Sequence, residues 1–209
     1  MKKLLNILIL ILWFPAVGQQ TPASTQVKSI LIQNAFIHIG DGTTIANGAL
    51  GFENGIITYV GDGQDAPLFD LTVDAQGQQL YPGFIAANST LGLAEVDAVR
   101  ATRDDDELGD FLPHIRAAIA YDAESKIVES MRPNGVLMAQ ITPRGGLISG
   151  SSSVMQLDAW NWEDALIKTE DGIHLNWPNP YSRGRSWLGE DPALKANENY
   201  LTTIEKLKA

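Results

Sequence analysis

Residues 81–90 read Tyr-Pro-Gly-Phe-Ile-Ala-Ala-Asn-Ser-Thr, and this stretch decides the predicted architecture. The apolar run Phe84–Ala87 has no polar alternation, which is typical of a strand covered on both faces. A second such run follows at Val136–Ile141. Between the two runs, residues 127–131 have helical spacing and are followed by Pro-Asn-Gly at 133–135. The order strand, helix, strand predicts parallel pairing, the unit from which α/β barrels are built.

The region upstream, residues 28–80, is predicted to be a small all-β unit. Asn54-Gly55 lies between two apolar runs, and this dipeptide suits a two-residue turn that needs positive φ at both positions. A hairpin is therefore expected there. Two short strands, Ile30–Ile32 and Ala35–Ile39, are expected before it with a break at Asn34, and Leu71–Asp74 is expected as a further strand.

The N-terminus has the layout of a signal peptide. Lys2 and Lys3 precede an uncharged run from Leu4 to Val17, which is shorter than the ~20 apolar residues of a spanning helix. We expect cleavage after Gly18, so that residues 1–18 are removed and 19–27 form a flexible lead-in; an uncleaved anchor is the alternative. Because the chain has no cysteine, no lipid-modified N-terminal cysteine can form. The mature protein is predicted to be periplasmic or secreted, with no stable membrane anchor.

The charge balance excludes nucleic acid as a partner. The chain carries 15 Lys and Arg against 25 Asp and Glu, a formal net charge of -10, whereas a polyanion requires clustered basic residues. The longest charged run is acidic, Asp104–Glu107, and it is predicted to be a solvated loop. A small-molecule substrate or ligand is the expected binding partner.

The order of a β unit with a glycine hairpin, a Pro-Gly-Phe-Ile strand and βα units resembles the amidohydrolase superfamily. Members of that family have a β-sandwich around an eight-stranded barrel, and their first barrel strand carries Pro-Gly-hydrophobic-Ile-Asp-x-His-x-His. The matching stretch here begins at Pro82, but Ala86 replaces the acid, Asn88 the first histidine and Thr90 the second. The resemblance implies metal-dependent hydrolysis of C-N bonds in the parent family, with zinc or another divalent metal.

The two replacements change the predicted chemistry of this strand. Residues at i and i+2 of a strand point to one face, so Asn88 and Thr90 are expected to keep the geometry of the two histidines. Zinc is bound by imidazole, thiolate or carboxylate, and an amide and a hydroxyl are poor substitutes. No metal or other cofactor is therefore predicted for this chain, and no catalytic residue can be assigned. Asn88, Thr90 and His174 are the candidate pocket residues.

The length predicts an incomplete barrel. A whole (β/α) barrel needs about 250 residues, and only 209 - 82 = 127 residues follow Pro82. The predicted fold class is α/β, a small β-sandwich unit at 28–80 followed by the first part of a TIM-like barrel at 81–209. In the family the remaining metal ligands come from later strands. We therefore expect this chain to be inactive alone, with a missing C-terminal half or a second copy of the chain as a partner.

An alternative is a non-catalytic periplasmic binding protein that uses an aromatic-rich surface. Five aromatic residues fall between positions 160 and 187, namely Trp160, Trp162, Trp177, Tyr181 and Trp187. Rigid amphipathic rings are common at binding surfaces.

Two further segments carry structural predictions. The glycine- and serine-rich segment 145–153 is predicted to be a tight loop after a barrel strand. Asp191-Pro192 is predicted to begin a helix with Leu194, Leu201, Ile204 and Leu207 on one face.

Overall fold

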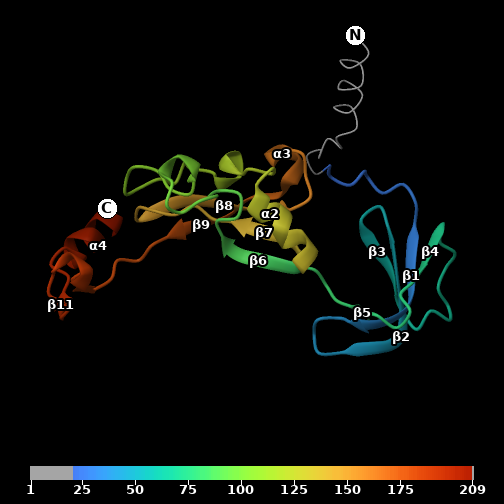
Figure 1. The fold of residues 1–209 in the computed structure, drawn as a ribbon. Helices are drawn as coiled ribbons and strands as arrows, with labels where there is room; N and C mark the ends of the chain where they lie inside the picture. Colours follow the sequence, from blue (N-terminus) through green and yellow to red (C-terminus); the bar gives the residue numbers. More distant parts are fainter. Residues whose placement is uncertain (1–20, 209) are drawn as a thin grey trace, which may run out of the picture.

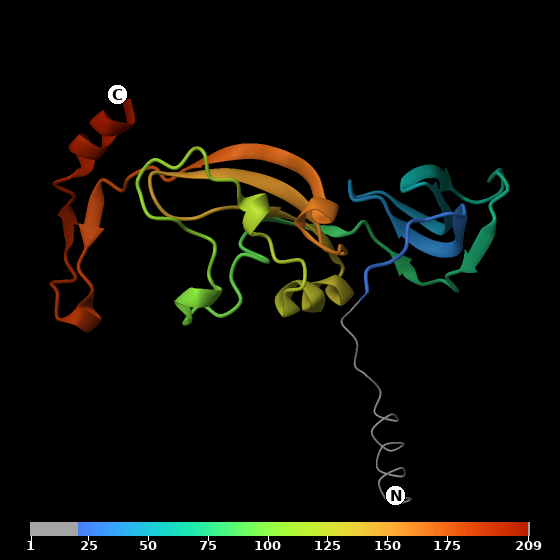
Figure 2. The same cartoon turned by 90° about the horizontal axis from the view of Figure 1, so that it is seen from above.

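The computed structural model describes residues 21–208. In Figures 1 and 2 three parts follow one another along the chain: a β unit, a central sheet with helices on one side, and a C-terminal part. The predicted signal peptide, residues 1–18, lies outside the described residues. No helix within 21–208 is long and apolar enough to cross a membrane.

The first part is a five-stranded sheet made of β1 (Ile30–His38), β2 (Thr44–Glu53), β3 (Ile56–Gly61), β4 (Leu71–Asp74) and β5 (Gln79–Leu80). The strand order is β3-β2-β1-β4, and β5 also pairs with β1. The predicted hairpin is present between β2 and β3, where Asn54 and Gly55 have φ values of 51° and 75°. Within the described chain this unit contains one sheet. A β-sandwich consists of two packed sheets, so the sandwich stays a prediction.

The predicted break at Asn34 is wrong, because β1 continues through it. Asn34 has a φ of 56° and sits at a register shift between β1 and β2. Its side-chain amide donates to Asp74 Oδ1 at 3.0 Å. The asparagine therefore forms a bulge within one strand, which is a common use of a residue that tolerates the left-handed region.

The central sheet has the order β6-β7-β8-β9, with β6 (Phe84–Ser89), β7 (Val136–Ile141), β8 (Ile148–Gln156) and β9 (Leu166–Leu175). Strands β6 and β7 are parallel, as predicted, and α2 (Lys126–Met131) lies between them in the chain. Strands β8 and β9 then continue antiparallel. The prediction of a loop at 145–153 is wrong from residue 148 onward, because that serine-rich segment belongs to β8 and pairs with β9.

Helical segments cover one face of the central sheet. The core contains Ala139, Ile141 and Met155 from the strands, and it contacts Val128 of α2 and Ala165 of α3 (Trp162–Ala165). A 3-10 helix, η2 (Ala117–Ala120), contributes further buried alanines to the same cluster.

The opposite face of the sheet is more open. Phe84 is 63% exposed and Ile85 56% exposed, so β6 is not covered on both faces in the described chain, contrary to the sequence prediction. In the neighbouring strand β7, Ala139 and Ile141 are buried, whereas Met138 and Gln140, which alternate with them, are only partly buried. Residues that alternate along a strand point to opposite faces. Gln140 therefore points to the open face.

The C-terminal part consists of β10 (Tyr181–Arg183), η4 (Ser186–Leu188), β11 (Leu194–Ala196) and α4 (Tyr200–Lys208). The predicted helix start at Asp191-Pro192 is wrong. The Asp191 carboxylate accepts a hydrogen bond from the Ala193 amide, which looks like a cap in sequence, but the chain turns into β11 and pairs with β10. Only the later members of the apolar stripe lie in α4, where Ile204 is buried and Leu201 exposed.

Candidate functional site

Asn88 lies at the carboxyl end of β6, in a bulge. Its φ is 51°. From Ala86 to Ser89 the chain advances three residues on β6 while the paired strand β7 advances two, so β6 contains one extra residue here. Thr90 follows the end of the strand, and its carbonyl accepts from the Leu93 amide at 2.9 Å. The expectation that Asn88 and Thr90 keep one strand geometry is wrong, because the left-handed residue interrupts the alternation.

Arg144 holds Asn88 through two hydrogen bonds. Its guanidinium donates to the Asn88 side-chain oxygen at 2.6 Å and to the Asn88 main-chain carbonyl at 2.6 Å. Arg144 comes directly after Pro143 beyond the end of β7, so both residues lie where the two parallel strands end. Ligands of open α/β sheets bind outside these carboxyl ends, which makes this edge the candidate site.

Gln140 links Asn88 to β9. Its side-chain oxygen accepts from the Asn88 amide at 3.1 Å, and its side-chain nitrogen donates to Asp171 Oδ2 at 2.7 Å. The other oxygen of Asp171 forms an ion pair with Lys168 at 2.6 Å. The hydrogen bond from Lys168, followed by the one from Gln140, lowers the pKa of Asp171, which therefore stays ionised near neutral pH.

His174, the third candidate residue, lies in β9 and is partly buried. Burial lowers the pKa of its imidazole, the positive charge of Arg144 lowers it further, and Asp171 acts in the opposite direction. Arg144 therefore contacts Asn88 directly and acts on His174 through its charge. Thr90 has no hydrogen bond to this group in the described chain.

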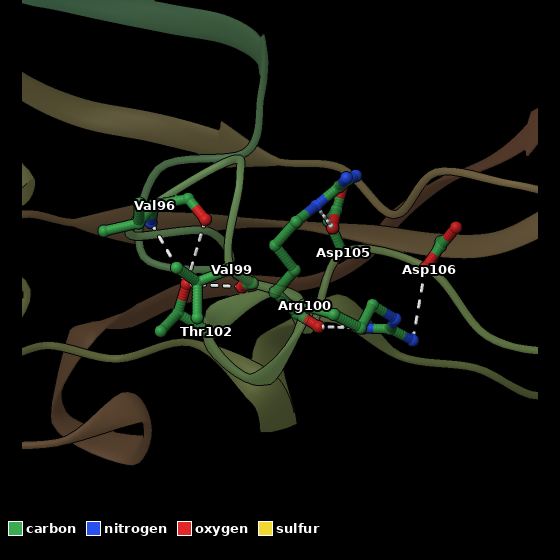
Figure 3. Close-up of polar contacts among 7 residues, drawn as sticks. Val96, Val99, Arg100, Thr102, Asp105 and Asp106 are labelled. Atoms are coloured by element: carbon green, nitrogen blue, oxygen red, sulfur yellow. Dashed lines mark hydrogen bonds and ion pairs between the residues drawn. The ribbon is translucent and has the colours of Figure 1, made fainter.

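The loop between residues 93 and 107 contacts the backbone of Arg144. Figure 3 shows its polar contacts: the Thr102 hydroxyl bonds to Val96 and Val99, and Arg100 forms an ion pair with Asp106. The main-chain amide of Arg144 donates to the Asp105 carbonyl at 2.5 Å. The loop therefore holds the backbone of Arg144 in place.

Asp105 itself is buried, so the prediction of a solvated acidic run is wrong at this residue. Its carboxylate is only 6% exposed and accepts two hydrogen bonds from the Arg103 guanidinium, at 3.2 and 3.1 Å. The hydrogen bond to Asp105 and its charge raise the pKa of Arg103. A buried carboxylate is stable here because it is paired.

The segment that follows Arg144 is also held by hydrogen bonds. The Asn176 amide donates to the carbonyls of Gly145 and Gly146, each at 3.0 Å, and to the Ser149 hydroxyl at 2.8 Å. Ser149 is buried and donates to the Gly145 carbonyl at 2.6 Å. Arg144 is thus anchored on both sides in the chain.

Sequence reasoning missed Gln140, Arg144 and Asp171. Two signals were available: Gln140 is the single polar residue in the run 136–141, and Arg144 stands three residues beyond that run, where a functional side chain would be expected. Asp171 gave no such signal, because β9 was not predicted.

The residues at this edge do not fit a metal ion. Within residues 21–208 no group of three His, Cys, Asp or Glu side chains could hold one. At the end of β6 the donors are an amide oxygen and a carbonyl oxygen, and both already accept from a cation, Arg144. Zinc requires nitrogen, sulfur or carboxylate ligands, so no catalytic step is assigned to a metal here.

A solved amidohydrolase from Thermotoga maritima matches this chain with a TM-score of 0.65 and 25% sequence identity, over 72% of the chain. The described chain has an amidohydrolase-like fold. The match covers 39% of the Thermotoga protein, so the amidohydrolase-like chain corresponds to about two fifths of that structure.

Two other solved structures give weaker matches to the amidohydrolase-like chain. A prolidase in complex with N-methylphosphonate-L-proline has a TM-score of 0.38 and 16% identity, with 53% of this chain and 25% of that chain covered. An ochratoxinase from A. niger has a TM-score of 0.31 and 21% identity, with 53% and 24% covered. No protein-family profile matches the sequence, and no curated protein matches it.

The aromatic residues predicted as one surface are divided between two places. Trp160, 60% exposed, lies just before α3, while Trp177 lies beyond the far end of β9. The ten residues of β9 span roughly 30 Å. Trp162 packs against the core, and Tyr181 and Trp187 are exposed in the C-terminal part.

Proposed function

We propose that this chain is an amidohydrolase-like protein that does not itself hydrolyse C-N bonds through a metal-activated water. The observation that carries the proposal is the bidentate contact of Arg144 with Asn88, at the strand end where the family resemblance calls for histidine ligands. A guanidinium there supplies a permanent positive charge, but it cannot lower the pKa of a bound water as zinc does.

The test is a turnover assay of the purified full chain. N-acyl amino acids and cyclic amides are incubated with the protein, with and without added zinc, and release of carboxylate or amine is measured. We expect no turnover above the uncatalysed rate in either condition. Zinc-dependent turnover that a chelator abolishes would contradict the proposal.

A second function, non-catalytic binding through aromatic side chains, is favoured by one specific observation. Trp177, Tyr181 and Trp187 are 57%, 54% and 77% exposed within the segment 177–187. Exposed aromatic rings of this kind bind sugars and peptides by stacking. A saturable change of tryptophan fluorescence with an oligosaccharide or peptide, lost in Trp177→Ala, would favour this function over the first.

A further inference from the structure

Arg144 is a cation without an ion-pair partner in the described chain. Its guanidinium donates to Asn88 alone, through an amide oxygen and a carbonyl oxygen, and both acceptors are neutral. Asp171, the carboxylate of the same network, is paired with Lys168 instead. The positive charge of Arg144 at the end of β6 is therefore not neutralised by a contacting carboxylate.

The position of this charge is fixed by its surroundings. The Asp105 carbonyl binds the Arg144 amide, and Arg103 keeps Asp105 in place through a bidentate contact. Because Arg144 is also partly buried, water screens its charge less than it would screen a fully exposed arginine. The lowered pKa of His174, to which Arg144 contributes, agrees with a positive field that extends across this edge.

We propose that Arg144 excludes divalent metal ions from the carboxyl end of β6. The replacement of the two histidines is then only part of the reason why the residues at this edge do not fit a metal ion. The inference rests on the proposed function and deepens it. A divalent ion beside Asn88 would lie close to a fixed guanidinium, and it would have to displace Arg144 from the Asn88 oxygen. Restoring histidines at positions 88 and 90 therefore does not by itself restore a metal site.

The experiment is zinc titration by calorimetry of the full chain and its variants. The double variant Asn88→His with Thr90→His is compared with a triple variant that adds Arg144→Gln. We expect the triple variant to bind zinc at least about tenfold more tightly than the double variant, because a repulsive charge has been removed. Adding Arg144→Lys instead, which keeps the charge, is expected to give no such gain.

Arg183→Gln in the double-histidine background is the matched control, because Arg183 is an exposed arginine of β10. The proposal is overturned if the double variant binds zinc as tightly as the triple variant, or if the lysine and glutamine variants bind equally well. Circular dichroism checks that each variant folds.

A second measurement needs only one substitution. In Arg144→Gln the pKa of His174, followed by NMR, is expected to rise, and an unchanged pKa would contradict a positive field at this edge. Zinc-dependent turnover by the wild-type chain would overturn the proposed function, whereas the comparison of metal affinity between the variants tests the role of Arg144 separately.

Discussion

Replacing Arg144 by methionine tests the contact on which the site depends. The substitution removes two charge-assisted hydrogen bonds to Asn88, each 2.6 Å long, and keeps much of the side-chain volume. A hydrogen bond contributes about 1 kcal/mol net, and charged ones up to ~3 kcal/mol. Because Asn88 is exposed and water can replace the lost donor, we expect a loss of about 1–2 kcal/mol in the free energy of unfolding.

A double-mutant cycle with Asn88→Ala isolates one of the two bonds. Alanine at this position is strained by the positive φ, but that strain cancels in the cycle. The main-chain carbonyl remains, so the coupling energy reports the bond from Arg144 to the Asn88 side chain and should be about 0.5–1 kcal/mol. Urea unfolding followed by tryptophan fluorescence is the assay, since Trp162 packs against the core of the central sheet.

Arg183→Met is the control for the loss of an arginine, because Arg183 is exposed and lies in β10. It should change the free energy of unfolding by less than about 0.5 kcal/mol. A coupling energy of zero, or equal losses for Arg144→Met and Arg183→Met, would show that the contact with Asn88 does not stabilise the fold.

Three further predictions concern the central sheet and the turn that follows β6. Ile141→Ala should lower the free energy of unfolding by about 2–5 kcal/mol in urea titrations, because Ile141 is completely buried. Since the folded pKa of His174 lies below its ordinary value of 6.5, the unfolded chain binds the proton more readily, and stability is lost as the pH falls below 6.5. The melting temperature of the wild type should therefore drop more between pH 7.5 and 5.5 than that of His174→Gln. Gly92→Ala should cost about 1–3 kcal/mol, since its Cβ would lie 2.6 Å from the Tyr121 ring.

Each of these predictions has a matched control. Ile173→Ala removes a side chain that is 65% exposed in β9, and a loss as large as that of Ile141→Ala would contradict the placement of the core. Gly189→Ala adds a methyl group at a similar φ of 77° with no atom within 4 Å, so it measures backbone strain alone. If Gly189→Ala is as destabilising as Gly92→Ala, the Tyr121 contact has no role. Equal pH responses of the wild type and His174→Gln would contradict the burial of His174.

Local sequence patterns predicted those parts of the fold that are determined mainly by neighbouring residues in the sequence. The Asn54-Gly55 turn and the parallel pairing of β6 with β7 follow from residue types that suit few alternatives. The β8 strand was missed because its glycines and serines look like a loop. It is a buried strand because it pairs on both sides with β7 and β9, which no local signal reports.

The candidate site was predicted only in part, for a similar reason. The sequence indicated Asn88 and His174 but not Arg144, because Arg144 reaches Asn88 from 56 positions away. The bulge at Asn88 also depends on contacts from Arg144 and Gln140. Side-chain networks between strands of distant sequence position are tertiary properties, and local sequence patterns do not reveal them.

At the end of β6, Arg144 donates to both oxygens of Asn88, and a metal ion bound there would have to displace it. The most direct measurement is the zinc content of the full wild-type chain after dialysis against buffered zinc, determined by mass spectrometry. We expect much less than one zinc per chain. One tightly held zinc per chain, lost when Asn88 and Thr90 are both replaced by alanine, would contradict it.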